Sequence, residues 1–332
     1  MKPQKVFIRT SERTMFVKCR QHWWWSYKER RKPIEQWSKA LVFGDMVHQA
    51  LAAYYIPETR NKRKRGPHPA ETFTKLYDVM DADGKAFNVR TDDEFWVSAR
   101  DLGQEMMENY VTTWAEADKS IVVIEPEMPF QYDITDPLSG EYLCTYVGTT
   151  DALVYDLRTA RYGLLEHKTA ASISTSHLFM DEQASTYWCI VPRWLRENGI
   201  IKPDQEFDFM LYNFLRKGKS DPRPVNNLGQ SLNRDGTVSK SQPPPLFHRE
   251  LLYRGKAEQE NTYERIIQQV KEMNLVREGK MPHYKAPSKD CSWCEWKDLC
   301  EMHETGSDWK ELRKEMTKKW EPYEVHLPAL EA

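Results

Sequence analysis

Two neighbouring segments of this chain carry acidic residues inside sequence that otherwise has the character of buried β-strands. The first covers 147–156 (VGTTDALVYD), the second covers 164–169 (LLEHKT), and the turn-forming sequence LRTA lies between them. Short apolar segments on either side of a turn predict an antiparallel β-hairpin. With the turn centred on the middle of LRTA, Asp151 would face Glu166 across the hairpin, with Cβ atoms about 5 Å apart.

Two carboxylates at this distance repel each other. Such a pair persists only if one of them is protonated or a cation lies between them, and a divalent metal ion is the most common solution. Side chains alternate along a strand, so Glu166 and Lys168 share a face while His167 points to the other. The hairpin is therefore predicted to present two acids and an amine.

This combination suits hydrolysis of a phosphodiester. Oxygen ligands hold Mg²⁺ or Mn²⁺, the ion lowers the pKa of a bound water, and a nearby ammonium orients the nucleophile or neutralises developing charge. A lone Glu-x-Lys also occurs as a simple ion pair on an exposed strand. Other segments must therefore support the hydrolytic interpretation.

Four segments match the motifs of a known family in the order of that family: GDMVH at 44–48, GTTD at 148–151, EHK at 166–168 and QASTY at 183–187. On these motifs the chain resembles the PD-(D/E)XK nuclease superfamily in its RecB-like branch, and is similar to CRISPR-associated and AddB-type exonucleases. The resemblance runs from about residue 15 to about residue 303.

The resemblance implies an α/β, restriction-endonuclease-like fold in which a mixed sheet is flanked by helices. It also implies that Asp151 and Glu166 bind metal, that His48 is a further metal ligand, and that Lys168 assists the attacking water. His48 lies in 43–55, whose apolar residues recur at helical spacing. A histidine on such a helix is often a buried, hydrogen-bonded residue instead, but the two acids favour the ligand.

Three further residues are candidates for the same site. Gln183 and Tyr187 are four apart in 177–196, which we expect to be helical, so both project from one face. They either line the cleft and contact the phosphate backbone, or Tyr187 packs and Gln183 is solvated; their position directly after Glu-x-Lys favours the catalytic site. Glu127, in a predicted strand at 122–130, is expected to lie behind the metal ligands, because RecB-like relatives often carry an acidic residue there.

The cysteines give a second signal. Cys291, Cys294 and Cys300 form C-x2-C-x5-C, and Cys19 stands alone near the start of the chain. Three thiols this close favour a metal site over disulfides. The resemblance implies a 4Fe-4S cluster held by all four cysteines, and tetrahedral zinc, with His22, His283 or His303 replacing one thiolate, is the alternative.

Such a site would be structural. A crosslink from residue 19 to residue 291 closes a loop over most of the chain, which a disulfide-type entropy estimate values at about 5 kcal/mol. We therefore expect N- and C-terminal helical segments joined at the cluster. Cys144 and Cys189 lie in apolar sequence and are expected to be core residues.

Charge does not by itself identify a nucleic-acid-binding protein, because 48 basic residues are balanced by 50 acidic ones. Two local clusters stand out: RNKRKR at 60–65, and RKGK at 216–219 together with Arg223. Each could either follow a phosphate backbone or be an ordinary solvated loop.

No linker-like composition divides the chain, so we expect a single domain over 1–332. Its parts would be a helical region at 1–120, the nuclease sheet at 121–255, and C-terminal helices with the cluster-binding segment at 256–332. No apolar run approaches the roughly 20 residues of a membrane span, and the first residues do not look like a secretory signal. We expect a cytoplasmic protein, in the host cytoplasm if virus-encoded, with no membrane contact.

The sequence thus predicts a metal-dependent DNA nuclease, acting as a single-strand exonuclease or a flap-trimming enzyme on single-stranded DNA or DNA ends. No nucleotide-binding P-loop motif is present, so unwinding would come from a helicase or recombination partner. The alternative is a non-catalytic subunit that binds single-stranded nucleic acid in a DNA-processing complex. The crowded acids argue against that alternative.

Overall fold

The segment that begins at Ile121 forms the centre of a mixed β-sheet. The computed structural model describes residues 5–34, 38–56, 64–86 and 88–324. The strands of the sheet are β1 (Phe7–Ile8), β3 (Ile121–Thr135), β4 (Tyr142–Asp156), β5 (Arg161–Ala170), β6 (Phe207–Arg216) and β7 (Phe247–Leu252). β4 pairs antiparallel with β3 and β5 and parallel with β1, while β6 pairs parallel with β5 and antiparallel with β7.

The hairpin of β4 and β5 has the predicted register. Ala152 faces Leu165 and Asp156 faces Arg161, and a turn at 157–160 joins the strands. The same register extended by one residue brings Asp151 to Glu166. The local pattern of apolar residues and turn was therefore sufficient to predict this pairing.

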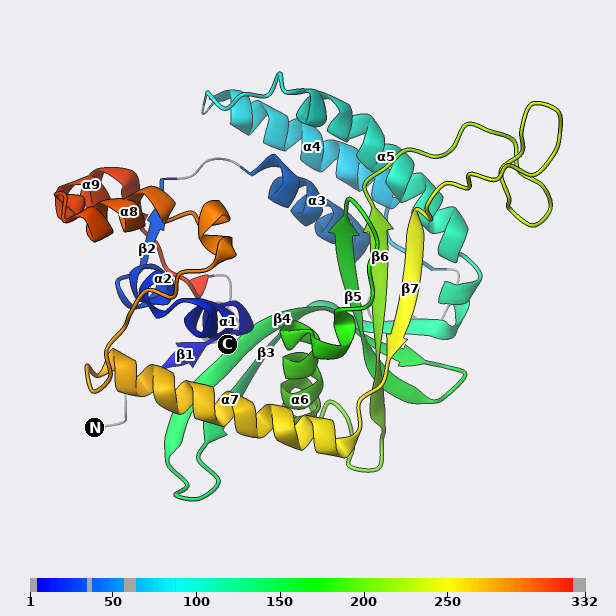
Figure 1. Cartoon of the computed structure of the whole chain (residues 1–332). Helices are drawn as coiled ribbons and strands as arrows, with labels where there is room; N and C mark the ends of the chain where they lie inside the picture. Colours follow the sequence, from blue (N-terminus) through cyan, green and yellow to red (C-terminus); the bar gives the residue numbers. More distant parts are fainter. Residues whose placement is uncertain (1–4, 35–37, 57–63, 87, 325–332) are drawn as a thin grey trace.

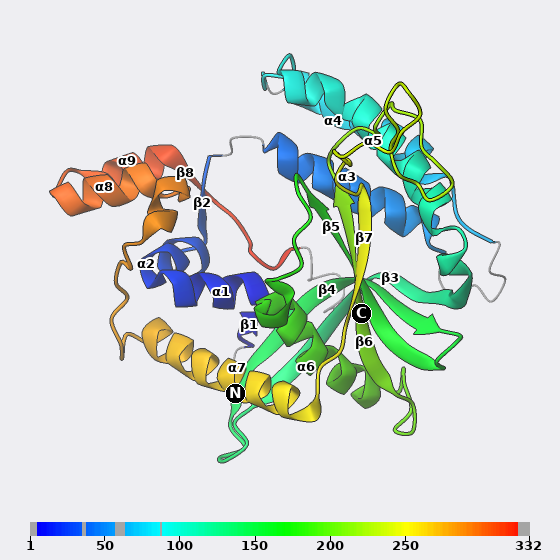
Figure 2. The same ribbon diagram turned by 45° about the vertical axis from the view of Figure 1, so that its right-hand side comes forward.

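Helices cover both faces of the sheet (Figures 1 and 2). One face carries α3 (Lys39–Tyr54), α4 (Pro69–Ala86) and α5 (Glu94–Trp114), and the other carries α6 (Glu182–Glu197) and α7 (Lys256–Arg277). Neighbouring leucines of β5 divide between the two cores, because Leu164 packs with α6 and α7 and Leu165 packs with α3 to α5. This is the expected mixed α/β arrangement of a sheet flanked by helices.

Segments from the N-terminal and C-terminal parts of the chain pack together in a lobe beside the sheet (Figure 1). The N-terminal part contributes α2 (Arg20–Trp23), the π-helical η1 (Trp24–Lys28) and β2 (Arg31–Pro33). The C-terminal part contributes η4 (Lys289–Trp293), α8 (Lys297–Thr305), α9 (Trp309–Met316) and β8 (Thr317–Lys319). β2 pairs antiparallel with β8, and Trp25, Trp296 and Leu299 form a small core of their own.

The helix α1 (Thr10–Lys18) connects this lobe to the sheet through a buried arginine. The guanidinium of Arg13 donates to the Tyr146 hydroxyl at 3.3 Å on β4, and to Thr186 at 2.7 Å and Glu182 at 2.9 Å on α6. It also donates to Gln269 on α7. A buried charge that is fully hydrogen-bonded in this way fixes the position of the elements it contacts.

The predicted elements after residue 120 agree with the structure, with one change of boundary. The helix expected at 177–196 begins at Glu182, because Asp181 caps it by accepting the Ala184 N–H at 2.7 Å. A separate turn of 3-10 helix, η3 (Leu178–Met180), precedes the cap. Among the described residues, no helix is both long and apolar enough to cross a membrane.

Candidate active site

Asp151 and His48 form the centre of the site. Asp151 lies on β4 and His48 on α3, and His48 Nδ1 is 3.1 Å from Asp151 Oδ1. α3 approaches β5 closely at Gly44, where a Cβ atom would lie 3.1 Å from Thr169 Oγ1. The glycine of the first motif therefore lets the helix pack close enough for its histidine, one turn later, to reach the acid.

Glu127 joins this pair. One ligand atom each from His48, Glu127 and Asp151 lie within 4.8 Å of one another, and this is the one such group of three in the described part of the chain. Glu127 has φ +47°, a left-handed conformation that is rare for a non-glycine residue within a strand. Strained backbone of this kind persists where surrounding structure imposes it, commonly at functional sites.

Glu166 is buried beside this group. Its side chain is 1% exposed, and its Oε1 has no hydrogen-bond partner. Burial first, and then the negative charge of Asp151, raise the pKa of Glu166 well above its usual value. An unpartnered buried carboxylate oxygen costs free energy unless a proton or a cation compensates it.

The pKa values of the other two acids, Glu127 and Asp151, shift in opposite directions. Burial and the charge of Asp151 raise the pKa of Glu127 to about 7. Burial acts in the same direction on Asp151, but the hydrogen bond and charge of His48, with the His167 N–H donating to Oδ2 at 2.6 Å, hold its pKa below the usual value. Three carboxylates thus share a site with too few protein cations to balance them, and a divalent ion is the group that fits this donor set.

His167 points away from Glu166 and Lys168, as predicted. Its ring stacks on Tyr55 with centroids 6.1 Å apart, and its Nδ1 lies 2.8 Å from the Asn213 amide. Burial lowers the pKa of His167 to about 3, so the ring is neutral. The side chain supports the strand while its backbone N–H orients Asp151.

Lys168 and Gln183 are in direct contact. The ammonium of Lys168 donates to Gln183 Oε1 at 2.7 Å, which joins the Glu-x-Lys strand to the start of α6. Tyr187, one turn later, donates its hydroxyl to the Thr149 carbonyl at 3.0 Å and is almost fully buried. Both side chains line the cleft, as the sequence predicted, and the Tyr187 hydroxyl is hydrogen-bonded to the protein backbone. Their catalytic role stays a prediction.

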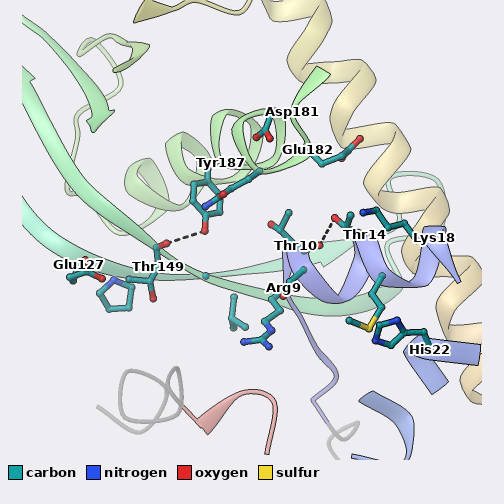
Figure 3. A pocket seen from close by; sticks show the side chains of 16 residues that line it. Arg9, Thr10, Thr14, Lys18, His22, Glu127, Thr149, Asp181, Glu182 and Tyr187 are labelled. Atoms are coloured by element: carbon teal, nitrogen blue, oxygen red, sulfur yellow. Dashed lines mark hydrogen bonds between the residues drawn. The ribbon is translucent and has the colours of Figure 1, made fainter. Parts of the chain in front are cut away.

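A cleft of about 1090 Å³ opens from this site. Figure 3 shows Glu127 and Thr149 at one end and Lys18 and His22 at the other, with α1 along one wall and the start of α6 along the opposite wall. The cleft runs between α1 and the start of α6 and reaches the site at Glu127 and Gln183.

One family model matches most of the chain. The family model of the PD-(D/E)XK nuclease superfamily matches residues 11–301. The chain belongs to the PD-(D/E)XK nuclease superfamily. No curated protein matches it. A solved structure from Eubacterium rectale described as a "Putative exonuclease" is similar at 9% identity and a TM-score of 0.48, covering 86% of each chain.

The structure groups the predicted metal-binding residues differently from the sequence prediction. The sequence assigned His48, Asp151 and Glu166 to the metal and placed Glu127 behind them. In the structure, Glu127 lies with His48 and Asp151, and Glu166 is adjacent and buried. Nothing in the sequence signals the left-handed backbone that turns Glu127 toward the acids.

Four of the six cysteines, Cys19, Cys291, Cys294 and Cys300, lie in or beside the terminal lobe. Burial first, opposed by Lys285, and then the charges of Cys19, Cys294 and Cys291 raise the pKa of Cys300, so the four thiols share one electrostatic neighbourhood. Their sulfur atoms do not form a group within ligand distance in the described residues. The cluster is therefore not established by the geometry. Cys144 and Cys189 are free and buried, as predicted.

Neither basic cluster forms a phosphate track that can be described. The cluster at 60–65 lies mostly outside the described residues, and the guanidinium of Arg65 donates to the Asp118 carbonyl. In the second cluster, Arg216 donates to the carbonyls of Pro244 and Pro245, and Arg223 holds Asp221 through paired hydrogen bonds. These arginines shape the loop between β6 and β7, where Arg216 has backbone carbonyls as partners and Arg223 has the nearby carboxylate of Asp221.

Proposed function

We propose that this protein is a metal-dependent DNA nuclease that hydrolyses phosphodiester bonds in single-stranded DNA, as an exonuclease or a flap-trimming enzyme. The observation that supports this most strongly is the convergence of His48, Glu127 and Asp151 beside the unpartnered oxygen of Glu166. A site of this composition in a member of a nuclease superfamily fits Mg²⁺ or Mn²⁺.

The metal would be held by His48, Glu127 and Asp151, with Glu166 completing the donor set. When bound, a divalent ion supplies Lewis-acid stabilisation of the phosphate and acidifies a coordinated water. The protein contributes a fixed arrangement: His48 and the His167 N–H orient the two oxygens of Asp151, so that the carboxylate is held in place before substrate arrives.

Lys168 would act on the attacking water or on charge that develops at the phosphate. Its ammonium is held by Gln183, which leaves the remaining donors of the –NH₃⁺ group available to the reacting atoms. Tyr187 is a positioning residue, because its hydroxyl fixes the β4 backbone at Thr149, two residues before Asp151. The helix α6 thus contacts β5 through Gln183 and Lys168, and β4 through Tyr187 and Thr149.

The cysteines Cys19, Cys291, Cys294 and Cys300 would hold a structural 4Fe-4S cluster. Cys294 and Cys300 pack against the core of Trp25, Trp296 and Leu299, an apolar shell suited to such a group. Zinc is the alternative, and His22 offers a nitrogen ligand, with Nδ1 3.7 Å from Cys294 Sγ. Metal analysis of protein purified without oxygen distinguishes iron with acid-labile sulfide from zinc.

Cleavage of end-labelled single-stranded DNA in the presence of Mn²⁺ tests the proposal. Wild-type protein is expected to release labelled products, and Asp151→Asn is expected to lose at least a hundredfold in rate, because one charged ligand is removed. Asp204→Asn is the matched control, since Asp204 lies in the exposed turn before β6, at the opposite end of the sheet. Products in all three proteins would indicate a contaminating nuclease.

The same experiment separates the alternative function. A non-catalytic subunit of a DNA-processing complex would bind the labelled strand tightly without releasing products. Labels at the 5′ and 3′ ends, compared in parallel, give the polarity of an exonuclease. Adding a helicase partner would then extend degradation into duplex DNA, which this chain is not expected to unwind.

A further inference from the structure

Two large apolar side chains stand exposed at the start of α6, next to the residues of the site. Phe179 is 70% exposed and Met180 is 72% exposed, whereas Leu178 beside them is 1% exposed. All three belong to η3, the single turn between β5 and α6. Exposing an adjacent phenylalanine and methionine leaves apolar area in water, and a ligand that covers the pair would remove it.

The turn that carries them is anchored on both sides. Leu178 packs in the main core, and its carbonyl accepts a hydrogen bond from Arg254 at 3.0 Å. Asp181 follows directly, capping α6 at Ala184 and accepting a hydrogen bond from Tyr212 at 3.3 Å. With Leu178 directed inward and Asp181 fixed, the two side chains between them are displayed outward on rigid backbone.

This display lies at the edge of the cleft. Asp181, Glu182 and Gln183 line the cleft together with Glu127 and Thr149, and Gln183 contacts Lys168 (Figure 3 shows Asp181 and Glu182 on this wall). Met180 directly precedes these residues. Phe179 and Met180 are therefore within one helical turn of side chains that would handle the scissile phosphate.

The chemistry of the segment favours bases over phosphates. Residues 170–180 (AASISTSHLFM) contain no lysine, arginine, aspartate or glutamate, and His177 is their one titratable side chain. A phosphate chain is held by positive charge, whereas bases stack on aromatic faces irrespective of sequence, and a thioether is a soft partner for an aromatic ring.

We propose that Phe179 and Met180 form a stacking platform for an unpaired base of the substrate next to the scissile phosphate. This inference rests on the proposed nuclease function and assigns the substrate as DNA whose terminal bases are not paired. A base inside a duplex is stacked on both faces and presents only its edges, so an internal base cannot engage the platform unless the strands separate.

Steady-state cleavage by Phe179→Ala tests the platform. Loss of one stacked base is expected to raise KM for a short single strand about five- to hundredfold, with kcat within about twofold of wild type. On a strand of equal length built from abasic sugar–phosphate units, wild type and Phe179→Ala are expected to be equal. Phe179→Trp should restore the low KM, because indole offers a larger face.

Leu138→Ala is the control for a general apolar effect, since Leu138 is 93% exposed in the turn between β3 and β4. It should behave as wild type. An unchanged KM in Phe179→Ala, or an equal rise on the abasic strand, overturns the platform. Binding to the same strands in Ca²⁺, measured by anisotropy, keeps the question separate from cleavage: absence of products in wild type rejects the nuclease, while the base-dependent loss of binding still tests Phe179.

Discussion

At the scale of single residues, Glu166 is held in a position that costs stability when no cation is near. It is buried against Asp151 and its Oε1 has no hydrogen-bond partner. Burial first, and then the charge of Asp151, raise the pKa of Glu166, so folding without metal requires either a proton on Glu166 or a buried charge without compensation. Stability is thereby given up in favour of a ready-made ligand.

In EDTA, Glu166→Gln is therefore expected to be more stable than wild type by about 1–2 kcal/mol in unfolding free energy. It should unfold at a higher temperature. A carboxyl whose folded pKa lies above its unfolded pKa loses stability as pH rises, so the advantage should be largest near pH 8 and small near pH 5. Thermal unfolding at the two pH values measures it, with the exposed Glu116→Gln as control.

Addition of Mn²⁺ should reverse the order. Wild type gains stability from a bound ion, about 2.7 kcal/mol at a hundredfold excess over Kd, and Glu166→Gln gains less because a ligand is lost. A variant that is less stable than wild type in EDTA would show that Glu166 is an ordinary structural acid.

At the scale of elements, close packing at Gly148 positions the strand β4 against its neighbour β3. A Cβ atom there would lie 2.6 Å from Cζ of Phe130 on β3. Phe130 in turn packs edge-on against Tyr187, with ring centroids 5.4 Å apart, and Tyr187 donates to Thr149. The glycine of the second motif thus allows the contact that positions the strand carrying Asp151.

Gly148→Ala is expected to destabilise the protein by about 1–3 kcal/mol and to reduce cleavage more than binding, because the methyl group displaces Phe130 and through it Tyr187 and β4. Unfolding curves and kcat are the measurements. Gly255→Ala is the matched control, since its nearest atom would be an ordinary 3.7 Å away. Equal effects of the two substitutions would contradict the packing argument.

At the scale of the whole molecule, the two ends of the chain are joined by more than the cysteines. β2 pairs with β8, the Trp296 indole donates to Ser26 at 3.1 Å, and the Trp320 indole donates to the Ser26 carbonyl at 2.8 Å. A metal site held by Cys19, Cys291, Cys294 and Cys300 would add a crosslink to an interface that already exists.

Cys294→Ser is accordingly expected to loosen the terminal lobe and leave the sheet intact. Hydrogen exchange should rise in residues 19–33 and 289–319, while the amides of β4, β5 and β6 stay protected. The thermal midpoint should fall by several degrees. Unchanged exchange throughout, together with wild-type protein that contains neither iron nor zinc, would remove the structural site.

The sequence was most informative where structure is local. The register of the β4–β5 hairpin, the opposite directions of Lys168 and His167, and the shared face of Gln183 and Tyr187 follow from alternation and helical spacing. The left-handed backbone of Glu127 does not, because a positive φ is uncommon for residues other than glycine and no sequence pattern indicates it here.

The partners of the basic side chains explain why the second basic cluster differs from a simple charged surface. Arg216 and Arg223 read as a basic surface until the carbonyls of Pro244 and Pro245 and the carboxylate of Asp221 are placed beside them. The platform of Phe179 and Met180 was equally hidden, because an apolar pair at the start of a predicted helix is normally expected in the core.

The most direct test of the account is the anomalous scattering of a crystal soaked in Mn²⁺. We predict a manganese peak within coordination distance of His48, Glu127 and Asp151, with an oxygen of Glu166 turned toward it. A peak on other residues, or a fully ordered site with no manganese at millimolar concentration, would contradict the claim that these four side chains form a metal-dependent catalytic centre.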